Sequence, residues 1–302
     1  MAVFYKAEKT TIINFANKIG FDISDFSARR LLTEEQNIEI ISLYRFCTST
    51  ELANRYHCSP SLIGKIWMEN DCKNKEYARQ YYSNFQYFKE IDSKDKAYFL
   101  GFIAADGCVF DRYNNRQQKL LSIGIHKKDE EVLIKFLYYL KSNNPINYTQ
   151  SKITPIVSIQ IVSNELCNYL SKYNIVPNKT WTYFPINIPN EFWWHFLRGF
   201  FDGDGSVGWE DDWLPHRNHI SMAGNQKLIQ TISDFLNDNN IKHGVYEDKR
   251  EKYTNRFYNL SINSKANKII FIERLYKDCN DLYLNRKKIK CDSFIEKCRS
   301  MQ

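Results

Sequence analysis

The sequence lacks the marks of a secreted disulfide protein, a zinc protein and a membrane protein. Its eight cysteines are scattered without a Cys-x-x-Cys pair, which is typical of reduced thiols in a cytoplasmic protein. The N-terminus has no apolar core of the kind that signal peptides carry. The longest apolar run, residues 97–105, is far shorter than the ~20 residues that a membrane helix needs. We therefore expect a cytoplasmic protein that has no membrane partner.

The composition is that of a folded soluble protein with a basic surface. The chain has 302 residues, of which 43% are hydrophobic and 25% are charged, so two or three domains with substantial cores are expected. The formal net charge is +7. Such a charge is compatible with a nucleic-acid partner but does not require one, because many basic proteins bind nothing anionic.

Two stretches of the chain share one pattern of apolar residues, glycine, a small residue, aspartate and glycine. They are residues 99–107 (FLGFIAADG) and 197–205 (LRGFFDGDG), and the aspartates Asp106 and Asp204 lie 98 residues apart. The density of apolar residues predicts a buried helix in each stretch, and the last glycine predicts a left-handed cap.

Small residues recur four positions apart within each stretch, namely Gly101 with Ala105 and Gly199 with Gly203. Residues at this spacing share one face of a helix, so each helix is expected to carry a flat stripe. Two such stripes allow two helices to pack backbone against backbone.

Parallel packing of the two helices would bring Asp106 and Asp204 together at their C-terminal ends. Two carboxylates there repel each other and face the negative ends of two helix dipoles. A divalent cation that prefers oxygen ligands would offset this cost and could activate water against a phosphodiester. The alternative is that each Asp-Gly pair simply ends a buried helix, but its duplication in register favours the paired site.

The segments that follow the two motifs also repeat, which supports two similar halves. Each half reads as helix, two strands, helix, two strands, helix. The expected segments are strands 108–113 and 119–126, helix 131–141 and strand 157–163 in the first half, and 206–209, 219–223, 227–237 and 258–264 in the second.

The last predicted strand of each half alternates between apolar and polar residues. One face of each strand should therefore be buried and the other wet. Polar side chains on a strand pair can contact base edges in the major groove. The alternative is an ordinary solvated sheet face. The candidate DNA-binding side chains are Ser158, Gln160, Asn259, Ser261 and Asn263.

Residues 33–70 have the pattern of three short helices. Thr33 to Gln36 form a capping box, a second helix start lies at residues 49–50, and a third lies at residues 59–61. This layout is typical of a helix-turn-helix. Its last helix would present Ser61 and Lys65 to DNA, although a small helical cluster without a DNA role has the same pattern. A helix over residues 9–19 carries no visible chemistry.

On the two motifs, the sequence resembles the LAGLIDADG homing endonucleases in the form with two motifs on one chain. The resemblance covers about residues 95–290. It implies an α/β (α+β) fold of two pseudo-symmetric αββαββα halves, residues 95–188 and 189–302, which pack through their motif helices and form a DNA-binding saddle. To this we add a small all-α N-terminal domain, residues 1–72, and a linker, residues 73–94.

The resemblance also implies a monomer that cuts both strands of a double-stranded DNA target. Asp106 and Asp204 would be the catalytic residues and would bind Mg²⁺ or Mn²⁺. The family often places a lysine at the end of the strand before the second helix, which assigns a catalytic role to Lys128, although a solvated lysine fits equally well. Its counterpart in the second half is Gly224, so the two strands need not be cut equally.

Basic residues recur near the ends of the two halves, as Lys179 in the first and as Arg286 and Lys287 in the second. They are predicted to contact DNA phosphates, unless they form a merely solvated basic run. An intron or a phage is the expected genetic source, with the protein near the nucleoid of its host. The alternative function is a transcription regulator or an intron RNA maturase that binds nucleic acid on the same scaffold without cutting it.

Overall fold

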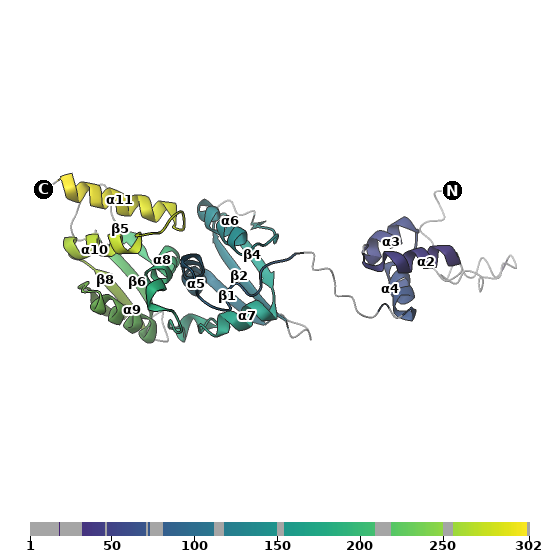
Figure 1. Cartoon of the computed structure of the whole chain (residues 1–302), viewed down its shortest axis with the longest axis horizontal. Helices are drawn as coiled ribbons and strands as arrows, with labels where there is room; N and C mark the ends of the chain where they lie inside the picture. The colour runs from purple at the N-terminus through teal and green to yellow at the C-terminus, as the bar shows by residue number, and fades with distance from the viewer. Residues whose placement is uncertain are drawn as a thin grey trace. The chain divides into compact units, whose positions relative to one another are not determined.

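The computed structural model describes residues 18, 32–45, 47–70, 72, 81–111, 118–149, 154–208, 219–249 and 256–300 (Figure 1). The chain divides into two compact units, Met1–Gln80 and Tyr81–Gln302. Each unit is treated by itself below. The helix expected over residues 9–19 lies outside the described residues except for Lys18.

The N-terminal unit contains the three helices that the sequence predicts. They are α2 (Glu34–Ser42), α3 (Ser49–Arg55) and α4 (Pro60–Glu69), with a 3₁₀ turn η3 (Leu43–Arg45) after α2. Thr33 and Thr48 each close a capping box, and Ser59 caps α4 ahead of Pro60. Trp67 lies in the small apolar core of this unit, and its indole N–H donates to the Ile40 carbonyl at 2.9 Å.

The larger unit is built from two similar halves, as predicted. The first half contains α5 (Lys94–Asp106), β1 (Gly107–Asp111), β2 (Lys119–His126), η4 (Lys127–Asp129), α6 (Glu130–Tyr139), β3 (Asn147–Tyr148), β4 (Ile156–Val162), α7 (Asn164–Ser171) and η5 (Lys179–Trp181). The second half contains η6 (Asn190–Phe192), α8 (Trp193–Asp204), β5 (Ser206–Gly208), β6 (His219–Asn225), α9 (Gln226–Asp238), β7 (Gly244–Asp248), β8 (Phe257–Ile262), α10 (Lys265–Leu275) and α11 (Asn285–Ser300).

Each half folds around a four-stranded antiparallel sheet. The strand orders are β1-β2-β4-β3 and β5-β6-β8-β7, so the two sheets have the same topology. In β4 the side chains of Val157, Ile159 and Ile161 are buried, whereas Ser158 and Gln160 are not. This confirms the predicted alternation and defines an open face on each sheet, opposite the helices that cover the core.

The two motif helices, α5 and α8, lie side by side at the centre of this unit (Figure 1). Their backbones touch through glycine. A Cβ atom on Gly101 would lie 2.0 Å from the Phe196 carbonyl oxygen, and one on Gly199 would lie 1.9 Å from that of Tyr98. No larger side chain fits such spaces, so the predicted flat stripes are confirmed.

The glycines that end the two motif helices do not form the predicted left-handed caps. Gly107 has φ −79° and Gly205 has φ −72°, and both are extended. Glycine is required there for a different reason. A Cβ on Gly107 would lie 2.6 Å from the Ile103 carbonyl oxygen, and one on Gly205 would lie 2.5 Å from that of Phe201.

The predicted linker over residues 73–94 is too long at its C-terminal end. Tyr87, Phe88 and Ile91 are buried in the core of the larger unit. The Asn84 amide donates to the Leu140 carbonyl at 2.8 Å. Residues 81–92 therefore belong to the first half, because Tyr87, Phe88 and Ile91 pack in its core.

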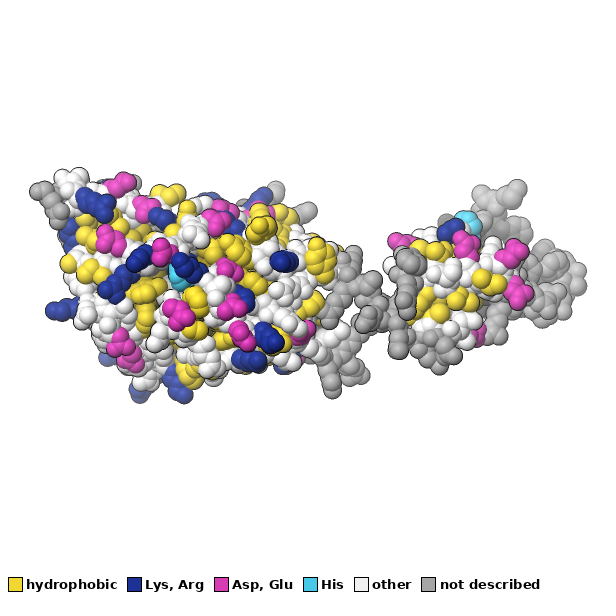
Figure 2. Space-filling view, in the orientation of Figure 1, with side chains coloured by type: hydrophobic (Ala, Val, Ile, Leu, Met, Phe, Trp, Pro, Cys, Tyr) yellow, Lys and Arg dark blue, Asp and Glu magenta, His cyan; other side chains and the backbone are white. Residues whose placement is uncertain are grey.

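The described surface mixes charges of both signs. Lys and Arg side chains are interspersed with Asp and Glu over the face shown in Figure 2. Among the described residues, no helix has the length and apolarity to cross a bilayer.

Candidate active site at the ends of the motif helices

The two motif aspartates end the two central helices. Asp106 is the last residue of α5, and Asp204 is the last residue of α8. The last turn of α8 touches the first carboxylate directly, since a Cβ on Gly203 would lie 3.0 Å from Asp106 Oδ2. The structure thus brings both carboxylates to one end of the helix pair.

The two carboxylates interact electrostatically, as predicted. The pKa of Asp106 is raised to about 6, mainly by burial and then by the charge of Asp204, while Lys287 and Lys179 oppose the shift. Burial also raises the pKa of Asp204, against the same two lysines. A carboxylate whose ionised form is disfavoured in this way is a ready partner for a cation.

Two buried lysines lie under the carboxylates and bind helix carbonyls, and their predicted contacts with DNA phosphates stay predictions. Lys179 is 8% exposed, and its amine donates to the carbonyl oxygens of Ala104 at 2.6 Å and Ala105 at 3.3 Å. Lys287 is 4% exposed, and its amine donates to the carbonyls of Phe201, Asp202, Gly203 and Gly205 at 2.5–3.3 Å.

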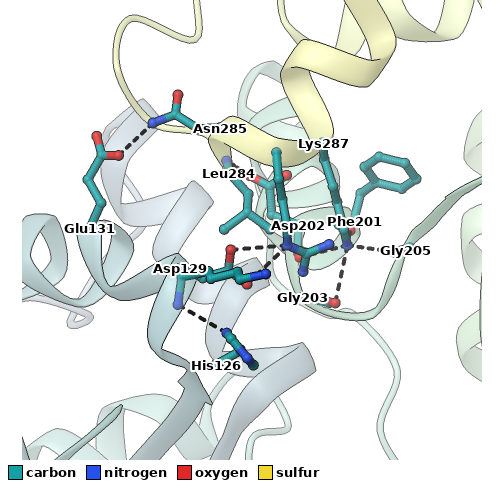
Figure 3. Close-up of polar contacts among 12 residues, drawn as sticks. His126, Asp129, Glu131, Phe201, Asp202, Gly203, Gly205, Leu284, Asn285 and Lys287 are labelled. Carbon is teal, nitrogen blue, oxygen red and sulfur yellow. Dashed lines mark hydrogen bonds and ion pairs between the residues drawn. The ribbon is translucent and has the colours of Figure 1, made fainter. Parts of the chain in front are cut away.

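These contacts explain how two carboxylates are tolerated at two helix C-termini. The last carbonyls of a helix have no partner within it, and they carry the negative end of the helix dipole. Lys179 satisfies the end of α5. Lys287 satisfies the end of α8, as Figure 3 shows. Burial lowers the pKa of both amines, that of Lys287 to about 8, and nearby carboxylates oppose the shift.

Of the two motif carboxylates, each lysine interacts more strongly with the one from the opposite half, although Asp202 acts on Lys287 more strongly than either. Lys287 lowers the pKa of Asp106 more than Lys179 does, and the order is reversed at Asp204. In the same way, Asp204 outweighs Asp106 among the charges that raise the pKa of Lys179. Each lysine thus hydrogen-bonds the C-terminal carbonyls of the motif helix in its own half. It also stabilises the ionised form of the motif aspartate in the other half.

A cavity of about 280 Å³ opens beside Asp106, between the first half and the C-terminal segment. Asp129 and Arg286 line it from opposite sides, and Arg286 Nε donates to both Asp129 oxygens at 3.0 and 3.1 Å. Asn285 donates to Glu131 next to this pair (Figure 3). Arg286 stays 54% exposed, and its contact with a DNA phosphate stays a prediction.

A buried polar network holds the segment that carries Lys287. Asp202 Oδ2 accepts from the Tyr98 hydroxyl at 2.9 Å and from the Leu284 amide at 2.8 Å. Arg198 is fully buried and donates to the carbonyls of Leu282 and Leu275 at 2.8 and 3.0 Å. Asp202 Oδ1 has no hydrogen-bond partner among the described residues.

Sequence reasoning gave this network no role, although one signal was present. An arginine inside an apolar helix, as in Leu197-Arg198-Gly199, is a charge that needs buried partners. The recurrence of Asn178-Lys179 and Asn285-Arg286-Lys287 did identify the two buried lysines. What the sequence could not show is that their amines turn inward.

The structure does not bring Lys128 to the carboxylates as a buried partner. Lys128 is exposed on η4, whose first turn is capped by His126. The cations that lower the pKa of Asp106 are Lys287 and Lys179. The catalytic role of Lys128 therefore stays a prediction, and the structure adds Lys179 and Lys287 as the cations that act on Asp106.

The predicted base-reading side chains lie on the open faces of the sheets or next to them. Gln160 and Asn263 are exposed, and Ser158, Asn259 and Ser261 are half-buried. In the N-terminal unit, Ser61 and Lys65 are exposed on α4. All seven are accessible, and their contacts with DNA stay predictions.

The two carboxylates fit a magnesium ion whose remaining ligands are water and substrate. They are too few to coordinate a metal through protein ligands alone. Among the described residues, no group of three or more His, Cys, Asp or Glu side chains is placed to hold a metal ion. Magnesium commonly binds through one or two carboxylates together with water and substrate phosphates. Asp106 and Asp204 supply two such carboxylates.

The comparisons with known proteins agree with this geometry. Residues 99–188 match the family described as LAGLIDADG endonuclease, and residues 193–276 match the LAGLIDADG-like domain. The two matches together span more than half of the 302 residues. The chain belongs to the LAGLIDADG family, in the form with two motifs on one chain.

Solved structures that resemble this chain have low sequence identity to it. The LAGLIDADG meganuclease I-AabMI, bound to uncleaved DNA, is 14% identical with a TM-score of 0.48, and the match covers 68% of this chain and 90% of that one. The homing endonuclease I-DmoI, in complex with DNA and Ca, is 16% identical with a TM-score of 0.43, over 64% of this chain and 90% of that one. No curated protein matches the sequence significantly.

Proposed function

We propose that this chain is a homing endonuclease that cuts both strands of a specific double-stranded DNA site. The observation that carries the proposal is the pair of aspartates that end two helices in backbone contact, each above a buried lysine. A protein that only binds DNA needs neither the carboxylates nor the costly burial of two amines. Membership of the family supports a nuclease activity.

In the proposed reaction, Asp106 and Asp204 would hold divalent metal, Mg²⁺ or Mn²⁺. When bound, the metal would supply Lewis acidity and an activated water for phosphodiester hydrolysis. The carboxylates would fix the position of the metal and accept a hydrogen bond from the attacking water. Lys179 and Lys287 place positive charge beneath the carboxylates, where it stabilises the negative charge that develops in the transition state.

Each proposed active site takes residues from both halves. Asp106 works with Lys287, and Asp204 works with Lys179, because these are the stronger electrostatic pairs. The cavity beside Asp106 supports this arrangement, since Leu284 and Arg286 of the second half line it together with His126 and Asp129 of the first. A single chain with pseudo-two-fold symmetry is then sufficient, and a monomer is the proposed active form.

The open faces of the two sheets are the proposed surface for the DNA major groove, and the N-terminal unit adds further contacts. Three capped helices with exposed Ser61 and Lys65 on the last one favour a helix-turn-helix role. Deleting residues 1–72 should shorten the DNA footprint on one side only, while the larger unit still cuts at high protein concentration. An unchanged footprint would assign these helices another role.

The direct test is incubation of the purified chain with a randomised double-stranded DNA library and Mg²⁺, followed by sequencing of the new ends. A single selected site with breaks on both strands is expected. The matched controls are Asp106→Asn and Asp204→Asn, which should still enrich the same sequence by binding. Enrichment without breaks in the native chain would instead support the regulator or maturase alternative.

A further inference from the structure

The open face of the first sheet ends in a row of apolar side chains. Phe110 of β1 pairs with Leu120 of β2, which pairs with Val162 of β4. Their neighbours Leu121 and Ile161 are buried on the helix side, so these three side chains point to the open face. Phe110 is 48% exposed, and Leu120 and Val162 are half-buried. We call these three residues the apolar row.

The second sheet carries polar residues at the same place. Gly208 of β5 pairs with His219 of β6, as Phe110 pairs with Leu120. Asn263 directly follows Ile262, the partner of Ile220, so the register sets it opposite His219. The two sheets therefore differ in chemistry at this outer position.

The rows nearer the carboxylates are polar in both sheets. Ser122 pairs with Gln160 in the first sheet, and Ser221 pairs with Ser261 in the second. The apolar row thus continues a face whose next row can form hydrogen bonds. The apolar row is not needed for the hydrophobic core, because the core lies on the other side of the sheet.

The distance of the apolar row from the carboxylates can be expressed in base pairs. β1 begins directly after Asp106, and Phe110 is the fourth residue beyond it. A strand rises by about 3.4 Å per residue, which equals the roughly 3.4 Å rise of one DNA strand per nucleotide. A strand that follows a groove therefore places Phe110 about three to four base pairs further out than Asp106.

Thymine is the base whose major-groove edge an apolar side chain can recognise, through its 5-methyl group. The other bases present only donors and acceptors there, which phenylalanine, leucine and valine would desolvate without replacing their hydrogen bonds. We propose that the apolar row selects thymine methyl groups in the outer part of the half-site bound by the first sheet. At the matching position of the other half-site, Asn263 reads a hydrogen-bonding edge, for which adenine is the best partner. This inference rests on the proposed DNA-binding function.

The test compares two randomised libraries, one made with thymine and one with deoxyuracil, which lacks only the methyl group. The native chain should enrich thymine several-fold over the other bases at one or two adjacent positions in the outer first half-site. With the deoxyuracil library that preference should disappear. Preferences in the outer second half-site should persist in both libraries.

Two variants assign the effect to the row. Phe110→Ser should abolish the thymine preference without changing the second half-site, and Phe110→Leu should retain it. Asn263→Ala is the matched control, which should relax only the second half-site. A site that is selected without a thymine preference at this position, or with one that survives in deoxyuracil, overturns the inference but leaves the proposed function intact. If no sequence is selected by either library, both are overturned.

Discussion

The two halves of the larger unit share one backbone plan but not one set of charges. Strand β6 runs directly into α9, whereas η4 is inserted between β2 and α6 and carries Asp129, the partner of Arg286. At the equivalent junction in the second half, Asn225 donates to the Tyr183 carbonyl, a neutral contact. Repetition of the fold therefore does not imply two equal active sites.

The motif helices differ in the same way. Asp202 and Arg198 of α8 correspond to Ala104 and Leu100 of α5, 98 residues earlier in each case. Among the residues that the structure describes, Asp202 and Arg198 of α8 form a buried network that fixes Leu284 and the nearby Lys287, and Ala104 and Leu100 of α5 have no side-chain groups for an equivalent one. The packing of the two motif helices depends on backbone shape and is symmetric. The buried charges and hydrogen bonds that hold the two lysines in place are not symmetric. We expect variants to expose this difference.

The largest effect is expected at the carboxylates, where the halves should behave alike. Asp106→Asn and Asp204→Asn each remove a proposed metal ligand with little change in shape, so each should lower double-strand cleavage by about a thousandfold or more. DNA affinity, measured by gel shift in Ca²⁺, should stay within a few-fold of the native value. A variant that still cuts both strands would contradict the shared site.

Substitution of each buried lysine should slow one active site more than the other. Lys287→Met and Lys179→Met remove a charge beneath the carboxylates, which is commonly worth ~2–4 kcal/mol of barrier, or roughly a hundredfold in rate. Single-turnover cleavage of DNA labelled on either strand measures each site. Lys287→Met should slow the strand cut at Asp106 more, and Lys179→Met the strand cut at Asp204. Lys128→Ala tests the exposed lysine, and normal cutting by this variant would assign the catalytic charge to the two buried lysines alone.

Much of the larger unit could be predicted from the sequence, because its signals are local. The repeated motif, the small residues four apart and the alternating strands each follow from backbone geometry, and all are confirmed. The inward turn of Lys179 and Lys287 could not be predicted, since a lysine beside an arginine or a threonine is usually solvated. It depends on unpaired carbonyls that are distant in sequence, at the ends of α5 and α8.

Contacts between residues that are distant in the sequence also explain two further corrections. Gly107 and Gly205 follow their helices as predicted, but the reason for glycine is a close backbone approach and not a left-handed cap. Residues 81–92 look polar and tyrosine-rich in sequence, yet Tyr87 and Phe88 are buried. In both cases a contact made only in the folded protein decides the outcome.

A smaller effect is expected from the buried network around Asp202 and Arg198. Asp202→Ala leaves the Tyr98 hydroxyl and the Leu284 amide without their acceptor, which costs about 1–3 kcal/mol of unfolding free energy. It should also slow the strand cut at Asp106 by about tenfold, because Lys287 loses its fixed position, and Asp202→Asn should recover part of this rate. Urea unfolding and strand-specific cleavage measure the two effects. Equal slowing of both strands would argue for general destabilisation alone.

The smallest effect concerns pH and metal. The folded pKa of Asp106, about 6, lies above its ordinary value of 3.8, so the folded state binds more protons than the unfolded state between these values. The unfolding free energy should therefore fall as pH rises from about 4 to 6 in EDTA, by about 1–2 kcal/mol after solvent screening is allowed for. Mg²⁺ should restore stability above pH 6, and Asp106→Asn should flatten the profile. A stability that rises over this range because of Asp106 would contradict the raised pKa.

The central claim is that two unequal active sites act on the two strands, each with a carboxylate from one half and a lysine from the other. A time course of supercoiled plasmid cleavage in Mg²⁺, with each strand labelled, tests it most directly. Because the two active sites are unequal, we expect nicked plasmid to accumulate before linear product, with one strand always cut first. We expect further that Lys287→Met and Lys179→Met retard opposite strands. Simultaneous cutting of both strands in the native chain, together with equal effects of the two lysine variants on both strands, would contradict this claim.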